Sequence, residues 1–180
     1  DVMFSEDDLA KKVTELGEMI TNDYKGEEVL VIGILKGANV FMSDLIRKIK
    51  IPIELDFMAV SSYGASTKSS GVVKIIKDLD YSIEGKNVLI VEDIIDTGLT
   101  LHYLQENMMT RGPKSFKICT LLDKPERRKA PIKVDYKGFD IPDEFIDSPI
   151  VSTNGMSGVF TGTIPALLIS STALKLKSIK

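Results

Sequence analysis

The stretch Lys86-Asn-Val-Leu-Ile-Val-Glu-Asp-Ile-Ile-Asp-Thr-Gly-Leu-Thr100 decides the fold of this chain. Its apolar first part, Lys86–Val91, follows a turn at Gly85 and predicts a short buried strand. The residues from Gly98 to Met109 predict a helix. A buried strand that runs directly into a helix is the unit from which parallel sheets with helices on both faces are built.

The same alternation of strand and helix extends outward from this stretch. Near the start, Ser5 and Asp8 form a loose capping box, and an apolar face at helical spacing follows. The patterns predict further strands at Glu28–Leu35, Glu54–Val60, Ser115–Leu122 and Val134–Phe139, a helix at Val40–Ile49, and a hairpin arm at Val72–Ile76. We therefore predict an α/β fold with a parallel twisted sheet flanked by helices.

Length and composition describe one ordinary globular domain. The chain has 180 residues, of which 43% are hydrophobic and 27% charged, and Cys119 is its single cysteine. One cysteine excludes an intramolecular disulfide and a cysteine-cluster metal site. The net charge of -3 gives no footprint for nucleic acid. Because the first residues lack an apolar signal region and the apolar runs are too short to cross a bilayer, we expect no membrane partner and a cytoplasmic location.

The charge is unevenly distributed along the chain. Residues 148–180 contain no Asp or Glu, three Lys and ten Ser or Thr, so this tail carries +3 and the body carries −6. A composition shift of this kind is typical of a boundary. We therefore expect a single domain over 1–180 with an atypical C-terminal tail at 147–180.

Two loops that follow predicted strands carry the candidate chemistry. After Val91, three carboxylates (Glu92, Asp93, Asp96) precede a Thr-Gly-Leu-Thr turn at the start of a helix. A helix N-terminus with a close glycine backbone favours a phosphate, while carboxylates suit vicinal hydroxyls, Mg²⁺ or proton transfer. Together they predict a site for a phosphorylated sugar. The alternative is that the acids and the glycine only cap a helix and close a turn.

The stretch Val88–Thr100 resembles the phosphoribosyl pyrophosphate (PRPP) motif of type I phosphoribosyltransferases. The wider chain is similar to the bacterial members of that family that act on hypoxanthine and guanine, over about residues 1–146. The segments that carry the resemblance are Gly33–Gly37, Asp56–Tyr63, Leu121–Pro125, Asp135–Phe139 and Ile141–Phe145. The resemblance implies the type I phosphoribosyltransferase fold, with a small hood formed by the terminal segments.

The implied reaction transfers 5-phosphoribosyl from PRPP to N9 of hypoxanthine or guanine, releases pyrophosphate and uses Mg²⁺. The resemblance places Glu92 and Asp93 at the ribose hydroxyls and the metal, and Asp96 as the general base near the purine N7. The residues that it assigns to the 5'-phosphate are Thr97, Gly98, Leu99 and Thr100. It also implies a homodimer or a homotetramer.

The resemblance assigns the remaining candidate residues as well. Lys36 and Gly37 match the pyrophosphate loop, in which the peptide between them can be cis, and Ser62 and Tyr63 match a lid that excludes water. The residues assigned to the purine are Lys133, which donates to O6, Phe145, which stacks on the base, and Ile146, whose backbone reads its edge. Taken alone, Lys36 and Lys133 are equally typical of solvated lysines, and Phe145 of a core aromatic.

The tail departs from the family pattern. Ser152 stands where the family has a metal-binding aspartate, and Gly158 stands where it has an arginine that contacts pyrophosphate. A serine cannot replace a carboxylate as an anionic ligand, and glycine offers no side-chain donor. Two alternatives therefore stay open: a PRPP- or nucleotide-binding protein with impaired turnover, and a tail from an altered reading frame. A phosphoacceptor receiver domain, in which an apolar strand also precedes Glu-Asp, is less favoured because the acidic strand end comes at residue 92 rather than near the N-terminus.

Overall fold

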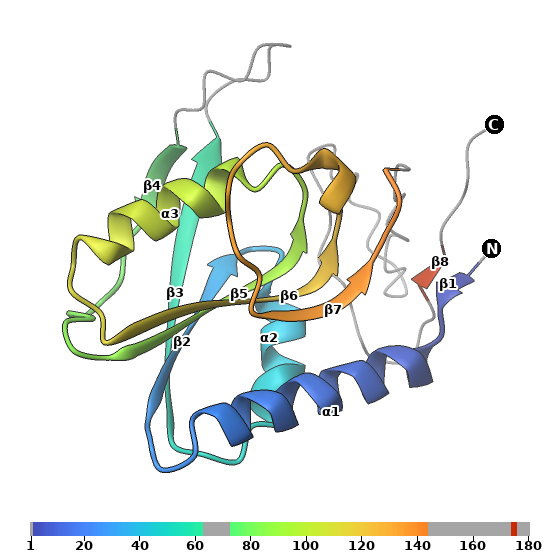
Figure 1. The fold of residues 1–180 in the computed structure, drawn as a ribbon, viewed down its shortest axis with the longest axis horizontal. Helices are drawn as coiled ribbons and strands as arrows, with labels where there is room; N and C mark the ends of the chain where they lie inside the picture. The colour runs from blue at the N-terminus through green and yellow to red at the C-terminus, as the bar shows by residue number, and fades with distance from the viewer. Residues whose placement is uncertain (1, 63–72, 144–173, 176–180) are drawn as a thin grey trace, which may run out of the picture.

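A six-stranded sheet forms the centre of the computed structural model, which describes residues 2–62, 73–143 and 174–175 (Figure 1). The strands lie in the order β4-β3-β2-β5-β6-β7, and β4 alone runs antiparallel to its neighbour. Their bounds are β2 (Val29–Leu35), β3 (Ile53–Ser62), β4 (Val73–Lys77), β5 (Asn87–Ile95), β6 (Ser115–Asp123) and β7 (Tyr136–Asp140). The predicted parallel α/β sheet and the predicted hairpin arm are both confirmed.

Helices cover the two faces of this sheet. The α1 helix (Glu6–Asp23) and the α2 helix (Asn39–Ile46) lie on one face, and α3 (Leu99–Met109) lies on the other (Figure 1). Alternate residues of β5 divide between the two layers: Val91 packs with α1 and α2, whereas Ile90 packs with α3. The central strands β2 and β5 are buried on both sides, which explains why they contain continuous apolar runs.

The start of α1 confirms the predicted capping box. The backbone N–H of Asp8 donates to Oγ of Ser5 at 3.1 Å, and the backbone N–H of Ser5 donates to Oδ2 of Asp8 at 3.0 Å. Two of the helix's unpaired N–H groups are thereby satisfied. The apolar face of α1 is buried against the sheet at Leu9, Val13, Leu16 and Ile20.

Several element boundaries differ from the prediction by a few residues, and two of them are those of β5 and α2. The β5 strand continues to Ile95, so Glu92 and Asp93 lie within a strand rather than in a loop. The pairing of β5 with β6 as far as Ile95 holds these residues extended. In the other case α2 ends at Ile46, three residues before the predicted end.

The terminal segments form a second, two-stranded sheet. In it, β1 (Val2–Phe4) pairs antiparallel with β8 (Leu174–Lys175), close to the start of α1 (Figure 1). Phe4 stacks on Phe139 of β7 with ring centroids 4.0 Å apart. The described helices include none with both the length and the apolar character needed to cross a bilayer.

Candidate active site

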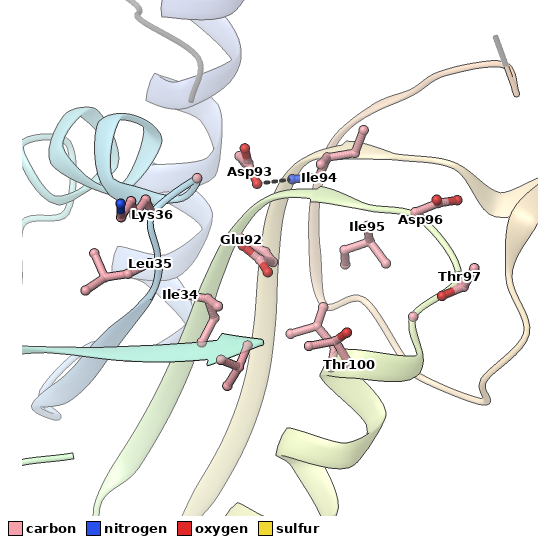
Figure 2. Close-up of a pocket in the computed structure, with 14 residues that line it drawn as sticks. Ile34, Leu35, Lys36, Glu92, Asp93, Ile94, Ile95, Asp96, Thr97 and Thr100 are labelled. Carbon is pink, nitrogen blue, oxygen red and sulfur yellow. Dashed lines mark hydrogen bonds between the residues drawn. The ribbon is translucent and has the colours of Figure 1, made fainter. Parts of the chain in front are cut away.

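A cavity of about 280 Å³ opens at the carboxyl ends of β2 and β5 (Figure 2). Ligands bind at this edge in open α/β sheets, because the loops there are free to diverge. The cavity brings together most of the predicted PRPP-binding residues: Lys36, Gly37, Glu92, Asp93, Asp96, Thr97, Gly98 and Thr100. Leu99 follows directly as the first residue of α3.

Glu92 and Asp93, the acidic pair, contribute two adjacent carboxylates to this cavity. Because neighbouring strand residues point to opposite faces, Glu92 lies on the α3 side and Asp93 on the α2 side. Figure 2 shows the two carboxylates leaving β5 in different directions. The strand thus places one carboxylate on each side of its own end.

Burial makes it unfavourable for both carboxyls of the acidic pair to be ionised at once. Asp93 is only 5% exposed, and its Oδ1 accepts from the backbone N–H of Ile94 at 2.9 Å. Its Oδ2 is buried and has no hydrogen-bond partner in the described part of the chain. Burial raises the pKa of Asp93 to about 6. Burial, and then the charge of Asp93, raise the pKa of Glu92 well above its usual value. Such a pair favours a nearby cation.

Gly37 lets the loop before α2 approach Asp93 closely. A Cβ atom on Gly37 would lie 2.6 Å from Oδ2 and 2.8 Å from Oδ1 of Asp93, so a larger residue cannot fit without displacement. Lys36, beside it, is exposed at the rim. The cis peptide joins Leu35 and Lys36. The prediction of a cis bond between Lys36 and Gly37 is therefore wrong by one residue.

The Thr-Gly-Leu-Thr turn forms the opposite wall of the cavity. Gly98 is the N-cap residue of α3 and has φ 75°, a conformation that glycine adopts without strain. The carbonyl of Thr97 accepts from the backbone N–H groups of Lys129 at 2.9 Å and Ala130 at 3.3 Å. These bonds hold the turn against the Lys129–Ala130 segment. The helix N-terminus and the hydroxyls of Thr97 and Thr100 are then available to an anion at the cavity.

Asp96 pairs with an arginine that the sequence analysis did not single out. Nε of Arg127 lies 2.5 Å from Oδ1 of Asp96, and its Nη1 lies 2.8 Å from Oδ1 of Asp143. Arg127 is the last residue of the short 3-10 helix η1 (Pro125–Arg127), which follows β6. The sequence gives no sign of this pair, because a basic loop is more often solvated and Asp96 follows a different strand of the sheet.

Arg128 was missed in the same way. Its guanidinium pairs with the buried Asp123 at the end of β6. A Cβ atom on Gly98 would lie 2.9 Å from its Nη1, so the arginine packs directly against the turn. Only the proximity of β5 and β6 in the sheet brings these residues together.

The proposed purine residues are only partly described. The side chain of Lys133 is 83% exposed and pairs with Asp135 at 2.8 Å, and Lys133 does not line the cavity. By contrast, Lys124 is 9% exposed at the end of β6, and its backbone N–H donates to the carbonyl of Ile95, beside Asp96. The predicted residues that lie outside the described ranges are Tyr63, Phe145, Ile146, Ser152 and Gly158.

Ser62 is the last residue of β3 and pairs with Val73 of β4, at the base of the predicted lid. Within residues 2–62, 73–143 and 174–175, no group of three or more His, Cys, Asp or Glu side chains gathers as a metal site. The acidic pair offers two carboxylates, which is the usual number of protein ligands for an Mg²⁺ ion that keeps several waters.

Comparison with known proteins gives a consistent result. The phosphoribosyl transferase domain family matches residues 5–152. The chain is similar to the hypoxanthine-guanine phosphoribosyltransferase of Bacillus subtilis (strain 168), with 59% identity over 145 residues that cover 81% of each chain. A relative of the same name from Mycobacterium bovis is 49% identical over 151 residues, covering 81% of this chain and 75% of that one.

Solved structures agree with these relatives. A hypoxanthine-guanine phosphoribosyltransferase from Bacillus anthracis, with a HEPES molecule in its active site, superposes with a TM-score of 0.77 at 54% identity, covering 81% of this chain and 85% of that chain. A hypoxanthine phosphoribosyltransferase from Staphylococcus aureus gives a TM-score of 0.78 at 51% identity, covering 81% and 79%.

Proposed function

This chain belongs to the phosphoribosyltransferase family, and we propose that it is a purine salvage enzyme that joins hypoxanthine or guanine to the 5-phosphoribosyl group of PRPP. The products are IMP or GMP and pyrophosphate. One observation supports this most directly. The acidic pair, the Thr-Gly-Leu-Thr turn and the Lys36-Gly37 loop, which are separate in the sequence, line one cavity at the carboxyl edge of the sheet.

PRPP fits this cavity by the chemistry of its groups. The turn from Thr97 to Thr100 binds the 5'-phosphate through backbone N–H groups and hydroxyls. The acidic pair faces the ribose hydroxyls, and the Lys36-Gly37 loop faces the pyrophosphate. This arrangement holds the reacting sugar between two anion sites with carboxylates in the middle, which fixes its orientation.

The same acidic pair would hold Mg²⁺. Its carboxylates are hard oxygen ligands, and the buried Oδ2 of Asp93 has no hydrogen-bond partner in the described part of the chain. A bound cation would lower the raised pKa values of both carboxyls and would offset charge on the pyrophosphate.

The residues of this chain act by charge and position. The bond from the anomeric carbon to the pyrophosphate oxygen breaks, the bond from that carbon to N9 forms, and the electron pair leaves with pyrophosphate. The purine must lose one proton, and we infer that Asp96 accepts it from N7. Positive charge that develops on the ribose lies near the carboxylates of the acidic pair, which stabilise it.

Recognition of the 6-oxopurine requires a cation near O6, with Phe145 and Ile146 at the base. We assigned this role to Lys133 from the resemblance, but its exposed side chain is paired with Asp135. Lys124 is buried beside Asp96 and is better placed. Lys124→Ala should reduce kcat/KM for hypoxanthine by at least about tenfold, as expected for a lost charged hydrogen bond. Lys133→Ala serves as the comparison, and the reverse ranking would restore the original assignment.

Nucleotide formation tests the proposed function. The protein is incubated with PRPP, Mg²⁺ and hypoxanthine, guanine, xanthine or adenine in separate reactions. We expect IMP and GMP, and no AMP, since the 6-amino group of adenine is a donor that a cation repels. Nucleotide no higher than in the reaction without protein would refute turnover.

A second candidate is a PRPP- or nucleotide-binding protein of the same fold with impaired turnover. It is favoured by Ser152 and Gly158, which replace a carboxylate and an arginine of the family pattern. Binding of PRPP or IMP by calorimetry without product would support it.

Translating the coding DNA of the tail in the other two frames tests the altered reading frame. Light scattering tests the expected homodimer or homotetramer, and cell fractionation tests the expected cytoplasmic location.

A further inference from the structure

Arg127 lies on the side of Asp96 that faces away from the acidic pair. Figure 2 shows the Asp96 side chain turned away from Glu92 and Asp93. We propose that Arg127 is a positioning residue that fastens Asp96, the general base of the proposed function, to the Ile141–Asp143 segment after β7. The inference rests on the proposed function and adds to it a residue that holds the general base in place.

The contacts of Arg127 make a bridge rather than a single ion pair. Its Nε lies 2.5 Å from Asp96, and its Nη1 lies 2.8 Å from Asp143. A guanidinium is planar and rigid, so two donors on one group hold two carboxylates at a fixed separation. Lysine carries one compact charge and cannot reproduce this geometry.

The arginine itself is held in place by its own element. The backbone N–H of Arg127 donates to the carbonyl of Lys124 at 3.1 Å, and the neighbouring Arg128 pairs with Asp123 of β6. The next residue, Lys129, donates its backbone N–H to the carbonyl of Thr97. The backbone that carries Arg127 is thus tied both to the sheet and to the phosphate turn.

The other end of the bridge lies in the short segment that follows β7. The backbone N–H of Ile141 donates to the carbonyl of Asp123 at 2.8 Å, and Ile141 is buried. Asp143 follows two residues later, and Phe145 two residues after that. The pairing of Asp143 with Arg127 therefore ties the Ile141–Asp143 segment to Asp96.

The negative charges of Asp96 and Asp143 require a cation between them. Asp96 and Asp143 both contact the same guanidinium, so without it two carboxylates would face each other and repel. The contact with Arg127 is made by Oδ1 of Asp96. On the proposed function, the carboxylate held in this way would accept the purine proton.

The experiment compares Arg127→Gln with the wild type and with a matched control, Arg47→Gln. Arg47 is an arginine paired with Asp44 beside α2, away from the cavity. We expect Arg127→Gln to raise KM for hypoxanthine about tenfold while KM for PRPP stays within about twofold, since misplacing one reactant by about 1 Å costs up to about 100-fold. Arg127→Lys should recover only part of the loss, and Arg47→Gln should match the wild type.

Asp143→Asn supplies the decisive second variant. Because it removes the repulsion, the double variant Arg127→Gln/Asp143→Asn should have a lower KM for hypoxanthine than Arg127→Gln alone. Equal KM values for Arg127→Gln and Arg47→Gln would overturn the proposal. It would also be overturned if the rise in KM of the double variant equalled the combined rises of Arg127→Gln and Asp143→Asn. Asp143→Asn on its own tests the bridge if Arg127→Gln does not fold.

A readout without ligand separates this inference from the proposed function. Amide hydrogen exchange of the ligand-free protein should speed up at Ile141 and Asp143 in Arg127→Gln and not in Arg47→Gln. If the wild type makes no nucleotide but this difference appears, the bridge stands and the turnover proposal fails. If the wild type makes nucleotide and neither exchange nor KM changes, the bridge fails and the function stands.

Discussion

Asp93→Asn should make the ligand-free protein more stable while it abolishes turnover. Burial raises the pKa of Asp93 from 3.8 to about 6, so above pH 6 the folded protein holds a charge that the unfolded chain carries more easily. A difference of this size amounts to about 3 kcal/mol. The amide nitrogen of asparagine would inherit the unpaired place of Oδ2, which costs about 1 kcal/mol. The net gain is about 2 kcal/mol, or about 4–8 °C in Tm for a chain of this length.

The sign of the pH dependence is a further part of this prediction. Between pH 4 and 6 the folded wild type binds the proton that the unfolded chain has lost, so wild-type stability falls as pH rises through this window. The advantage of Asp93→Asn should therefore be absent near pH 4 and complete above pH 6.

Urea denaturation without divalent cations measures this at pH 4.0, 5.0 and 7.5. Glu84→Gln, which removes an exposed carboxylate, is the control and should track the wild type. Adding Mg²⁺ at pH 7.5 should stabilise the wild type more than Asp93→Asn. An Asp93→Asn protein that is no more stable than the wild type at pH 7.5, or one whose advantage is the same at pH 4.0, would refute the reasoning.

Three further predictions follow from packing and burial. Gly37→Ala places a Cβ 2.6 Å from the acidic pair, so we expect unfolding free energy to fall by about 1–3 kcal/mol and KM for PRPP to rise; an unchanged KM would contradict this. Gly98→Ala should destabilise more than Gly85→Ala in urea denaturation, because both have positive φ but only Gly98 meets other atoms; equal losses would argue against the contact. Cys119 is buried, and burial raises the pKa of its thiol, so the native protein should resist a thiol reagent that labels the urea-unfolded chain; rapid native labelling would contradict the packing.

The sequence by itself determined most of the elements and the Thr-Gly-Leu-Thr end of the candidate site. The capping box at Ser5, the apolar run before Glu92 and the Thr-Gly-Leu-Thr turn are all local patterns. Local patterns depend on backbone preferences and on burial period, and both can be recognised within a few neighbouring residues. Two loops that follow parallel strands must also meet at one edge of the sheet, so the joining of Lys36 with Glu92 was predictable from topology.

Only the tertiary structure decided how these residues are held. The pairing of β5 with β6 carries the strand through Glu92 and Asp93, and the return of the chain after β6 places Arg127 on Asp96. Lys124 and Lys133 are both lysines beside a strand end in the sequence, yet one is buried and the other is exposed. The physical reason is that the repeating pattern of apolar residues, which predicts buried positions, says nothing about whether a charged side chain is buried. Its partner is set by which distant strand lies beside it, and that is a property of the folded sheet.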